Sequence, residues 1–285
     1  MKKIPTRRLS PEQQESAFAE QFLIRDIPSL LKGADLVQEL HRHDFYYLLA
    51  LQQGSGEHSI DFNTYPVSDH SLFIMRPGQV HRLRLQAGST GYLVQFGTGF
   101  TAGRDNVWQQ ALQHACRYPY YNAGRERMTQ LLHLLDALAA EIGAKQEPYK
   151  DAVAAYVYLF LVSVQRLQER PPHATGLYRQ EQLDAFRTLL EAHSHEQKLV
   201  AYYAQQLHLS PYQLNAITKA LLNKTCSEMI ADQVLLEARR YLLGTKSQVK
   251  EIAARLGFDD VAYFIRFFRK HTGISPGAFR DKNPG

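Results

Sequence analysis

VKEIAARLGFDDVAYFIRFFRKHTGISPGAFR, residues 249–280, interleaves aromatic and basic side chains between a glycine turn and a Ser-Pro pair. In a helix that begins near Asp260, positions 264, 267 and 268 lie on one face, because helical neighbours are three or four residues apart. All three positions are phenylalanine, which predicts a buried face. The opposite face carries small apolar and basic side chains: Val261, Ala262, Ile265, Arg266 and Arg269.

A second stretch, AYYAQQLHLSPYQLNAITKAL at 201–221, repeats this pattern about 50 residues earlier. Ala204 and Ala253 occupy matching positions, where two helices that cross through a short turn need a small side chain. Gly257 suits the second turn because glycine readily adopts positive φ angles. Each copy therefore predicts a helix-turn-helix. A single copy could be an ordinary hairpin with a solvated basic face, but two copies with matching apolar spacing favour DNA binding.

The charge of this region fits that interpretation. Residues 183–285 contain 14 Lys and Arg against 10 Asp and Glu, so +4 of the net charge of +5 lies there. Such a balance permits a polyanionic partner. Ser210 before Pro211, and Thr225 three residues before Glu228, are patterns that begin helices.

Residues 185–281 closely resemble the DNA-binding region of the AraC/XylS family of bacterial transcription regulators, through EIAARLGF, YFIRFFRKHTG and SPGAFR. The resemblance implies that a long helix, 227–244, joins two helix-turn-helix units that enter successive major-groove segments. Ala216 stands where the family often has arginine, and Asn223 where it usually has glycine. The predicted DNA contacts are Tyr212, Asn215, Ala216, Lys219, Val261, Ala262, Ile265, Arg266 and Arg269.

From about Leu36 to Phe96, short β-rich runs alternate with Gly, Ser, Asp and Pro turns, which predicts an antiparallel sandwich or barrel. Apolar residues then recur at helical spacing over 128–142 and 153–167, which predicts two amphipathic helices. Their apolar stripes could cover the sheet, form a subunit interface, or do both. The following ERPPHATGLYRQE, residues 169–181, has the composition of a linker.

HRHDFY at 41–46 and PGQVH at 77–81 resemble the cupin-type sensor half of the same regulators. His41, His43 and His81 match the metal ligands of catalytic cupins, whereas Tyr47 stands where those enzymes carry glutamate. Imidazole nitrogens can bind several transition metals.

We weigh three roles for these histidines. Structural or hydrogen-bonding roles are favoured, followed by effector contacts, and then by a metal site. The predicted effector contacts are His41, His43, Tyr47 and His81, with no metal and no cofactor expected. Arginines near the same hairpin could meet an anionic ligand, although exposed arginines on strands are usually only solvated: Arg76, Arg82 and Arg84.

Together these patterns predict an α+β chain with a cupin-like antiparallel β-barrel, two helices, and an all-α C-terminal domain of two helix-turn-helix units. The expected divisions are a sensor domain at 1–125, a helical dimerisation or packing segment at 126–171, a linker at 172–182, and a DNA-binding domain at 183–285.

The predicted function is non-enzymatic: a sequence-specific transcription factor that regulates bacterial promoters in response to a small-molecule effector. Expected partners are promoter DNA, RNA polymerase, the effector and a second copy through helices 127–168. The alternative is a cupin metalloenzyme with a helical accessory domain, which the missing glutamate disfavours. Cys116 and Cys226 lack paired spacing, and no apolar run approaches the roughly 20 residues of a membrane span, so we expect a cytoplasmic protein.

Overall fold

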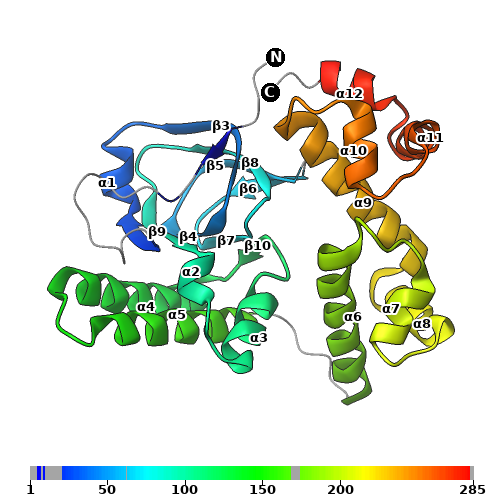
Figure 1. Cartoon of the computed structure of the whole chain (residues 1–285). Coiled ribbons are helices and arrows are strands. Elements are labelled where there is room, and N and C mark those ends of the chain that lie inside the picture. The colour runs from blue at the N-terminus through cyan, green and yellow to red at the C-terminus, as the bar shows by residue number, and fades with distance from the viewer. Residues whose placement is uncertain (1–4, 8, 10–20, 62, 168–173, 283–285) are drawn as a thin grey trace. The chain divides into compact units, whose positions relative to one another are not determined.

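The structure, a computed structural model, describes residues 5–7, 9, 21–61, 63–167 and 174–282 (Figure 1). Its contacts divide the chain into two compact units, Pro5–Glu169 and Arg170–Gly285, called here the N-terminal unit and the C-terminal unit. The first contains two β-sheets with helices, and the second is helical. This confirms the predicted α+β fold class.

In the part of the chain that the structure describes, the N-terminal unit is built on two five-stranded sheets. Sheet A has the order β1-β3-β8-β5-β6 and sheet B the order β10-β7-β4-β9-β2. All pairings are antiparallel except that of β1 with β3. The strands are β1 (Thr6–Arg7), β2 (Phe22–Asp26), β3 (Leu36–His43), β4 (Phe45–Gln53), β5 (Gly56–Ile60), β6 (Asn63–Val67), β7 (Ser71–Met75), β8 (Val80–Leu85), β9 (Thr90–Gly97) and β10 (Tyr120–Asn122).

Sheet B is buried on both faces, which explains the unbroken apolar run in β4. Side chains alternate across a strand. Tyr47 and Leu49 therefore join the core between the two sheets, while Leu48 and Ala50 join the core under the helices.

The described residues of this unit form five helices: α1 (Ile27–Leu31), α2 (Thr98–Thr101), α3 (Asn106–Ala115), α4 (Arg125–Ala144) and α5 (Tyr149–Gln165). Met128, Leu135, Val157 and Leu161 from α4 and α5 share one buried cluster with sheet B. The two amphipathic stripes thus cover the sheet within one chain. In Figure 1 these two helices run together beneath the strands.

The C-terminal unit contains seven helices within its described residues: α6 (Ala174–His193), α7 (Val200–Gln206), α8 (Pro211–Leu222), α9 (Cys226–Gly244), α10 (Val249–Arg255), α11 (Val261–Thr272) and α12 (Pro276–Lys282). One core cluster joins helices α6 to α11. The linker expected at 172–182 is helical from Ala174 onward, because α6 continues into Leu183, Phe186 and Leu190, which are buried in that core. Residues 168–173 lie outside the described part of the chain.

Across the described residues, no helix combines the length and apolarity that crossing a membrane requires.

Candidate nucleic-acid interface and histidine cluster

Two helix pairs in the C-terminal unit have the same turn geometry. The amide of Leu209 donates to the carbonyl of Ala204 at 2.9 Å, and the amide of Phe258 donates to the carbonyl of Ala253 at 3.0 Å. The residue before each donor, His208 or Gly257, has a positive φ angle. The α7–α8 and α10–α11 pairs are therefore structural copies, with helix α9 between them.

The copies differ in how tightly the turn is packed. A Cβ atom on Gly257 would lie 2.1 Å from the backbone oxygen of His195. Lys198 also donates to the carbonyl of Gly257 at 2.9 Å and places its ammonium 4.7 Å from the ring centre of Phe258. The second turn therefore needs glycine for its conformation and also for its close approach to residues 195–198. In the first copy, histidine occupies the equivalent position.

Helix α11 buries a narrower face than the sequence predicted. Phe264 and Phe268 are fully buried, whereas Phe267 is half-buried at the edge of the core. Val261, expected to face outward, is half-buried and packs against the same core. The reason is helical spacing: positions 261, 264 and 268 form one line, and 267 flanks it.

The exposed face of α11 carries Ala262, Ile265, Arg266 and Arg269. Sequence reasoning missed Tyr263, whose side chain is 56% exposed and lies beside Arg266, with 6.0 Å between the guanidinium and the ring centre. The sequence reasoning assigned Tyr263 to neither face, although its place three residues before Arg266 puts both side chains on the same side of the helix. These side chains form a basic, partly apolar surface along the exposed face of α11.

Arg266 forms one weak ion pair with the residues that the structure describes. Its guanidinium lies 3.6 Å from Oδ2 of Asp260, and both side chains are mostly exposed. The other carboxylate oxygen of Asp260 caps α11 by accepting from the amide of Ala262 at 2.7 Å. An exposed ion pair of this kind contributes about 0–1 kcal/mol, so Arg266 can exchange it for another anion or acceptor at small cost.

Helix α8 exposes Tyr212, Ala216 and Lys219, and Tyr212 is 84% exposed. Asn215 is different, because its side-chain carbonyl accepts the amide of Cys226 at 2.9 Å and so ties α8 to the first turn of α9. The side-chain carbonyl of Asn215 is therefore occupied within the fold, and its contact with a base remains a prediction.

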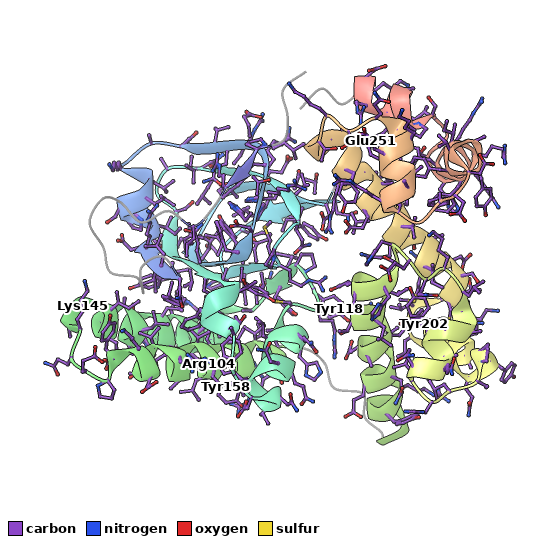
Figure 2. All side chains as sticks on the ribbon, in the orientation of Figure 1. Arg104, Tyr118, Lys145, Tyr158, Tyr202 and Glu251 are labelled. Atoms are coloured by element: carbon purple, nitrogen blue, oxygen red, sulfur yellow. The ribbon has the colours of Figure 1, made fainter. Side chains whose placement is uncertain are left out.

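Further side chains fix the ends of helices in this unit. Glu251 on α10, labelled in Figure 2, accepts the amide of Gln248 at 2.8 Å and closes the first turn of that helix. Arg280, in the SPGAFR phrase, donates to the carbonyls of Leu242 and Ser247 at 2.9 and 2.8 Å. This arginine holds the C-terminal end of α9, so part of the family-like signature stabilises the fold.

In the N-terminal unit, the predicted histidines lie together between the sheets. Nε2 of His81 lies 2.7 Å from Nε2 of His43 and 3.0 Å from Nε2 of His41. Nδ1 of His81 lies 2.8 Å from Nε2 of His58, and Nδ1 of His41 donates to the carbonyl of Glu39 at 2.6 Å. These four rings are called here the histidine cluster.

Sequence reasoning did not assign a role to His58. Alternation puts His58 and Ile60 on the same face of β5, but the pairing of Ile60 with His81 depends on strand register, which alternation alone does not specify. The tyrosine at the cupin glutamate position is also in contact with the cluster, because the ring of Tyr47 stacks on His43 at 5.4 Å.

Burial keeps the histidine cluster neutral. The four rings are 0–4% exposed. Desolvation lowers the pKa of His41 to about 4, that of His43 to about 3 and that of His58 to about 3, and it lowers the pKa of His81 well below its ordinary value. Each ring thus carries one proton and one lone pair at neutral pH.

The arginines near the same hairpin lie outside this cluster. Arg82 pairs with Glu57 at 3.4 Å, and Arg84 is exposed on β8. An anion-binding role for Arg76, Arg82 or Arg84 stays a prediction.

Residues 34–160 match the family model of the AraC-like ligand binding domain, and residues 203–282 match that of a helix-turn-helix domain. The chain belongs to the AraC/XylS family of DNA-binding transcription regulators. This confirms the family and function expected from the sequence, and the metalloenzyme alternative is not favoured.

Relatives of this AraC/XylS regulator are named as HTH-type transcriptional regulators or activators. The chain is 25% identical to an uncharacterized HTH-type transcriptional regulator, YfiF, of Bacillus subtilis, over 85% of this chain and 78% of that one. It is 23% identical to the HTH-type transcriptional activator RhaR of Cronobacter sakazakii, over 85% and 86% of the two chains. Among solved structures, the C-terminal domain of AraT, a response regulator from Geobacillus stearothermophilus, is 27% identical over 36% of this chain and 87% of that chain, with a TM-score of 0.35.

Proposed function

We propose that this regulator activates transcription by placing the exposed faces of α8 and α11 in the major groove of promoter DNA. The observation that carries the proposal is the mixed basic and apolar face of α11, presented by one of two structurally equivalent helix pairs. RNA polymerase is the further partner that activation requires, and the cytoplasm is where promoter DNA lies. The activator names of relatives support the positive sign of regulation.

The two recognition helices differ in the chemistry that they offer. On α11, Arg266 can bind guanine with two hydrogen bonds, and Ile265 and Ala262 can contact thymine methyl groups. On α8, Ala216 has no donor, so Tyr212 and Lys219 supply the polar contacts. We therefore propose that the second helix pair contributes more base discrimination than the first.

Replacing Arg266 by alanine tests this assignment. Arg266→Ala is expected to cost about 1–3 kcal/mol of specific binding and to relax the preference at one base pair, because a bidentate guanine contact is lost. Binding to a library of DNA sequences, measured at several salt concentrations, gives both the preference and the salt slope.

The matched control is Arg179→Ala, which removes an exposed arginine from α6. It should leave the base preference unchanged. An equal loss of affinity for all sequences in Arg266→Ala would instead assign Arg266 to a phosphate, and wild-type protein without any sequence preference would contradict the proposed recognition.

We further propose that the N-terminal unit binds a small-molecule effector and that two copies associate through α5. On its exposed face, α5 carries Ala155 and Leu159 four residues apart, and Leu159 is 48% exposed. Effector binding in this unit would change the population of DNA-binding arrangements of the dimer.

Leu159→Glu is expected to shift the chain from dimer to monomer, because it places a charge in an apolar contact. Sedimentation velocity over a range of concentrations measures the shift. Val107→Glu, at a 59% exposed apolar position on α3, is the matched control and should leave the dimer intact. Equal behaviour of the two variants would contradict an interface on α5.

A further inference from the structure

The protons available to the histidine cluster do not satisfy its short contacts. The carbonyl of Glu39 can only accept, so Nδ1 of His41 carries the proton and Nε2 of His41 is a bare lone pair. Nε2 of His81 faces that lone pair at 3.0 Å and Nε2 of His43 at 2.7 Å. One neutral ring nitrogen has either a proton or a lone pair, so it cannot make two separate hydrogen bonds here.

Both tautomers of His81 leave a defect. With a proton on Nε2, that single proton is divided between two acceptors, and His43 must carry its own proton on Nδ1. Nδ1 of His43 is buried and has no hydrogen-bond partner among the described residues. With a lone pair on Nε2, His43 can donate to it, but the lone pairs of His41 and His81 then face each other at 3.0 Å. Buried polar atoms without partners are costly.

We propose that Nε2 of His41, His43 and His81 together bind one divalent transition-metal ion of the zinc class. An ion at their meeting point accepts all three lone pairs and so removes the contact between the lone pairs of His41 and His81. Nδ1 of His43 has no partner among the described residues with or without the ion. These three nitrogens lie within 4.8 Å of one another and are all buried. The proposal gives a ligand class to residues predicted to contact the effector, and it rests on the N-terminal unit being a ligand-binding domain but not on how DNA is read.

The groups behind two of the three rings, those of His41 and His81, support this assignment. Histidine ligands of metals usually donate their second ring nitrogen to a carbonyl or another acceptor, which fixes the ring orientation. Nδ1 of His41 does this with Glu39, and Nδ1 of His81 can do it with Nε2 of His58 at 2.8 Å. His58 is therefore a positioning residue.

The donor set also restricts the ion. The described residues offer three imidazole nitrogens and no carboxylate at this point, which suits Zn²⁺, Ni²⁺, Cu²⁺ or Fe²⁺ and not the oxygen-seeking Mg²⁺ or Ca²⁺. Zinc lies about 2.0–2.1 Å from imidazole nitrogen, so three tetrahedral ligands stand about 3.3 Å apart. The two short pairs, His81 with His43 at 2.7 Å and His81 with His41 at 3.0 Å, need to separate by a few tenths of an ångström. The cationic Arg7 on β1 opposes the ion, so Arg7→Gln should strengthen binding.

Metal uptake by the full-length chain, purified without a histidine tag and stripped by a chelator, tests the proposal. We expect one Zn²⁺ per chain by elemental analysis after desalting, and a Co²⁺ absorption band of a nitrogen-bound site. His81→Gln and the double variant His41→Gln/His43→Gln should lose at least 100-fold in zinc affinity. His58→Gln should lose about 10- to 100-fold. His133→Gln, which changes an exposed histidine on α4, is the matched control and should bind like wild type.

The wild-type chain keeps the test decisive even if a cluster variant does not fold. Zinc should raise the melting temperature of wild type and of His133→Gln after chelation, because an ion that binds only the folded state stabilises it. Stripped wild type that takes up less than one-tenth of an equivalent of zinc would overturn the proposal, as would equal uptake by folded His81→Gln. DNA binding is measured separately, so failure of the metal site is distinguishable from failure of the proposed DNA recognition.

Discussion

Phe264→Ala is expected to lower the free energy of unfolding of the C-terminal unit by about 3–5 kcal/mol. The ring of Phe264 is fully buried and lies 5.2 Å from Phe258 and 6.1 Å from Phe268, measured between ring centres. Its removal leaves a cavity at the centre of the α10–α11 pair, which close-packed neighbours cannot fill without moving.

Phe267→Ala is the matched control, since it removes the same side chain from the edge of the same helix. Phe267 is half-buried and packs beside Phe258 and His271, so the expected cost is about 1–2 kcal/mol. Hydrogen exchange of amides in α9, α10 and α11 measures the opening free energy of this unit. The fluorescence of Trp108, in the N-terminal unit, should not change. A cost for Phe267→Ala equal to that of Phe264→Ala would contradict the observed orientation of α11.

Gly257→Ala is expected to cost about 2–4 kcal/mol in the same unit. Two causes add: alanine is strained at a φ of +67°, and its Cβ would stand 2.1 Å from the carbonyl oxygen of His195. The turn must then move away from residues 195–198 and weaken the bond from Lys198. The same hydrogen-exchange measurement, with peptides that cover 195–198, gives the size of the loss.

Gly273→Ala separates the two causes. Gly273 also has a positive φ, +78°, but a Cβ there would meet nothing within 4 Å. It should therefore cost only the conformational part, about 1–2 kcal/mol. Equal costs at both glycines would show that the close approach at Gly257 relaxes freely.

Local sequence patterns were sufficient to predict the buried phenylalanines and the helix starts of the C-terminal unit. Phe264 and Phe268 follow helical spacing, and Thr225 with Glu228 forms the capping box that its spacing predicts. The surroundings that the sequence did not predict there depend on contacts between helices. Asn215 bonds to Cys226 eleven residues away, and Val261 is covered by the core. The spacing of residues along one helix does not show which other helices pack against it.

The N-terminal unit shows the same limit more strongly. The resemblance to cupins predicted His41, His43 and His81 as one group, and alternation along a strand placed His41 and His43 on one face. Their approach to within hydrogen-bonding distance depends on the pairing of β3 with β8, which has an irregularity between Gln38 and His41. His58 joins them only through the pairing of β5 with β8. Strand register is set by long-range packing, and sequence alternation alone did not specify it.

The hydrogen bond between Lys198 and Gly257 has a consequence for the arrangement of the operator. Residues 195–198 precede the first helix pair and contact the turn of the second, through the hydrogen bond from Lys198 and the close approach of His195 to Gly257. Both pairs share one core. The two recognition helices are therefore held at a fixed separation and phase. Each base pair inserted between their binding segments turns the second segment by about 34° and moves it by about 3.4 Å. If α8 and α11 enter the major groove as proposed, the length of the spacer, which neither helix touches, is then part of what this protein recognises.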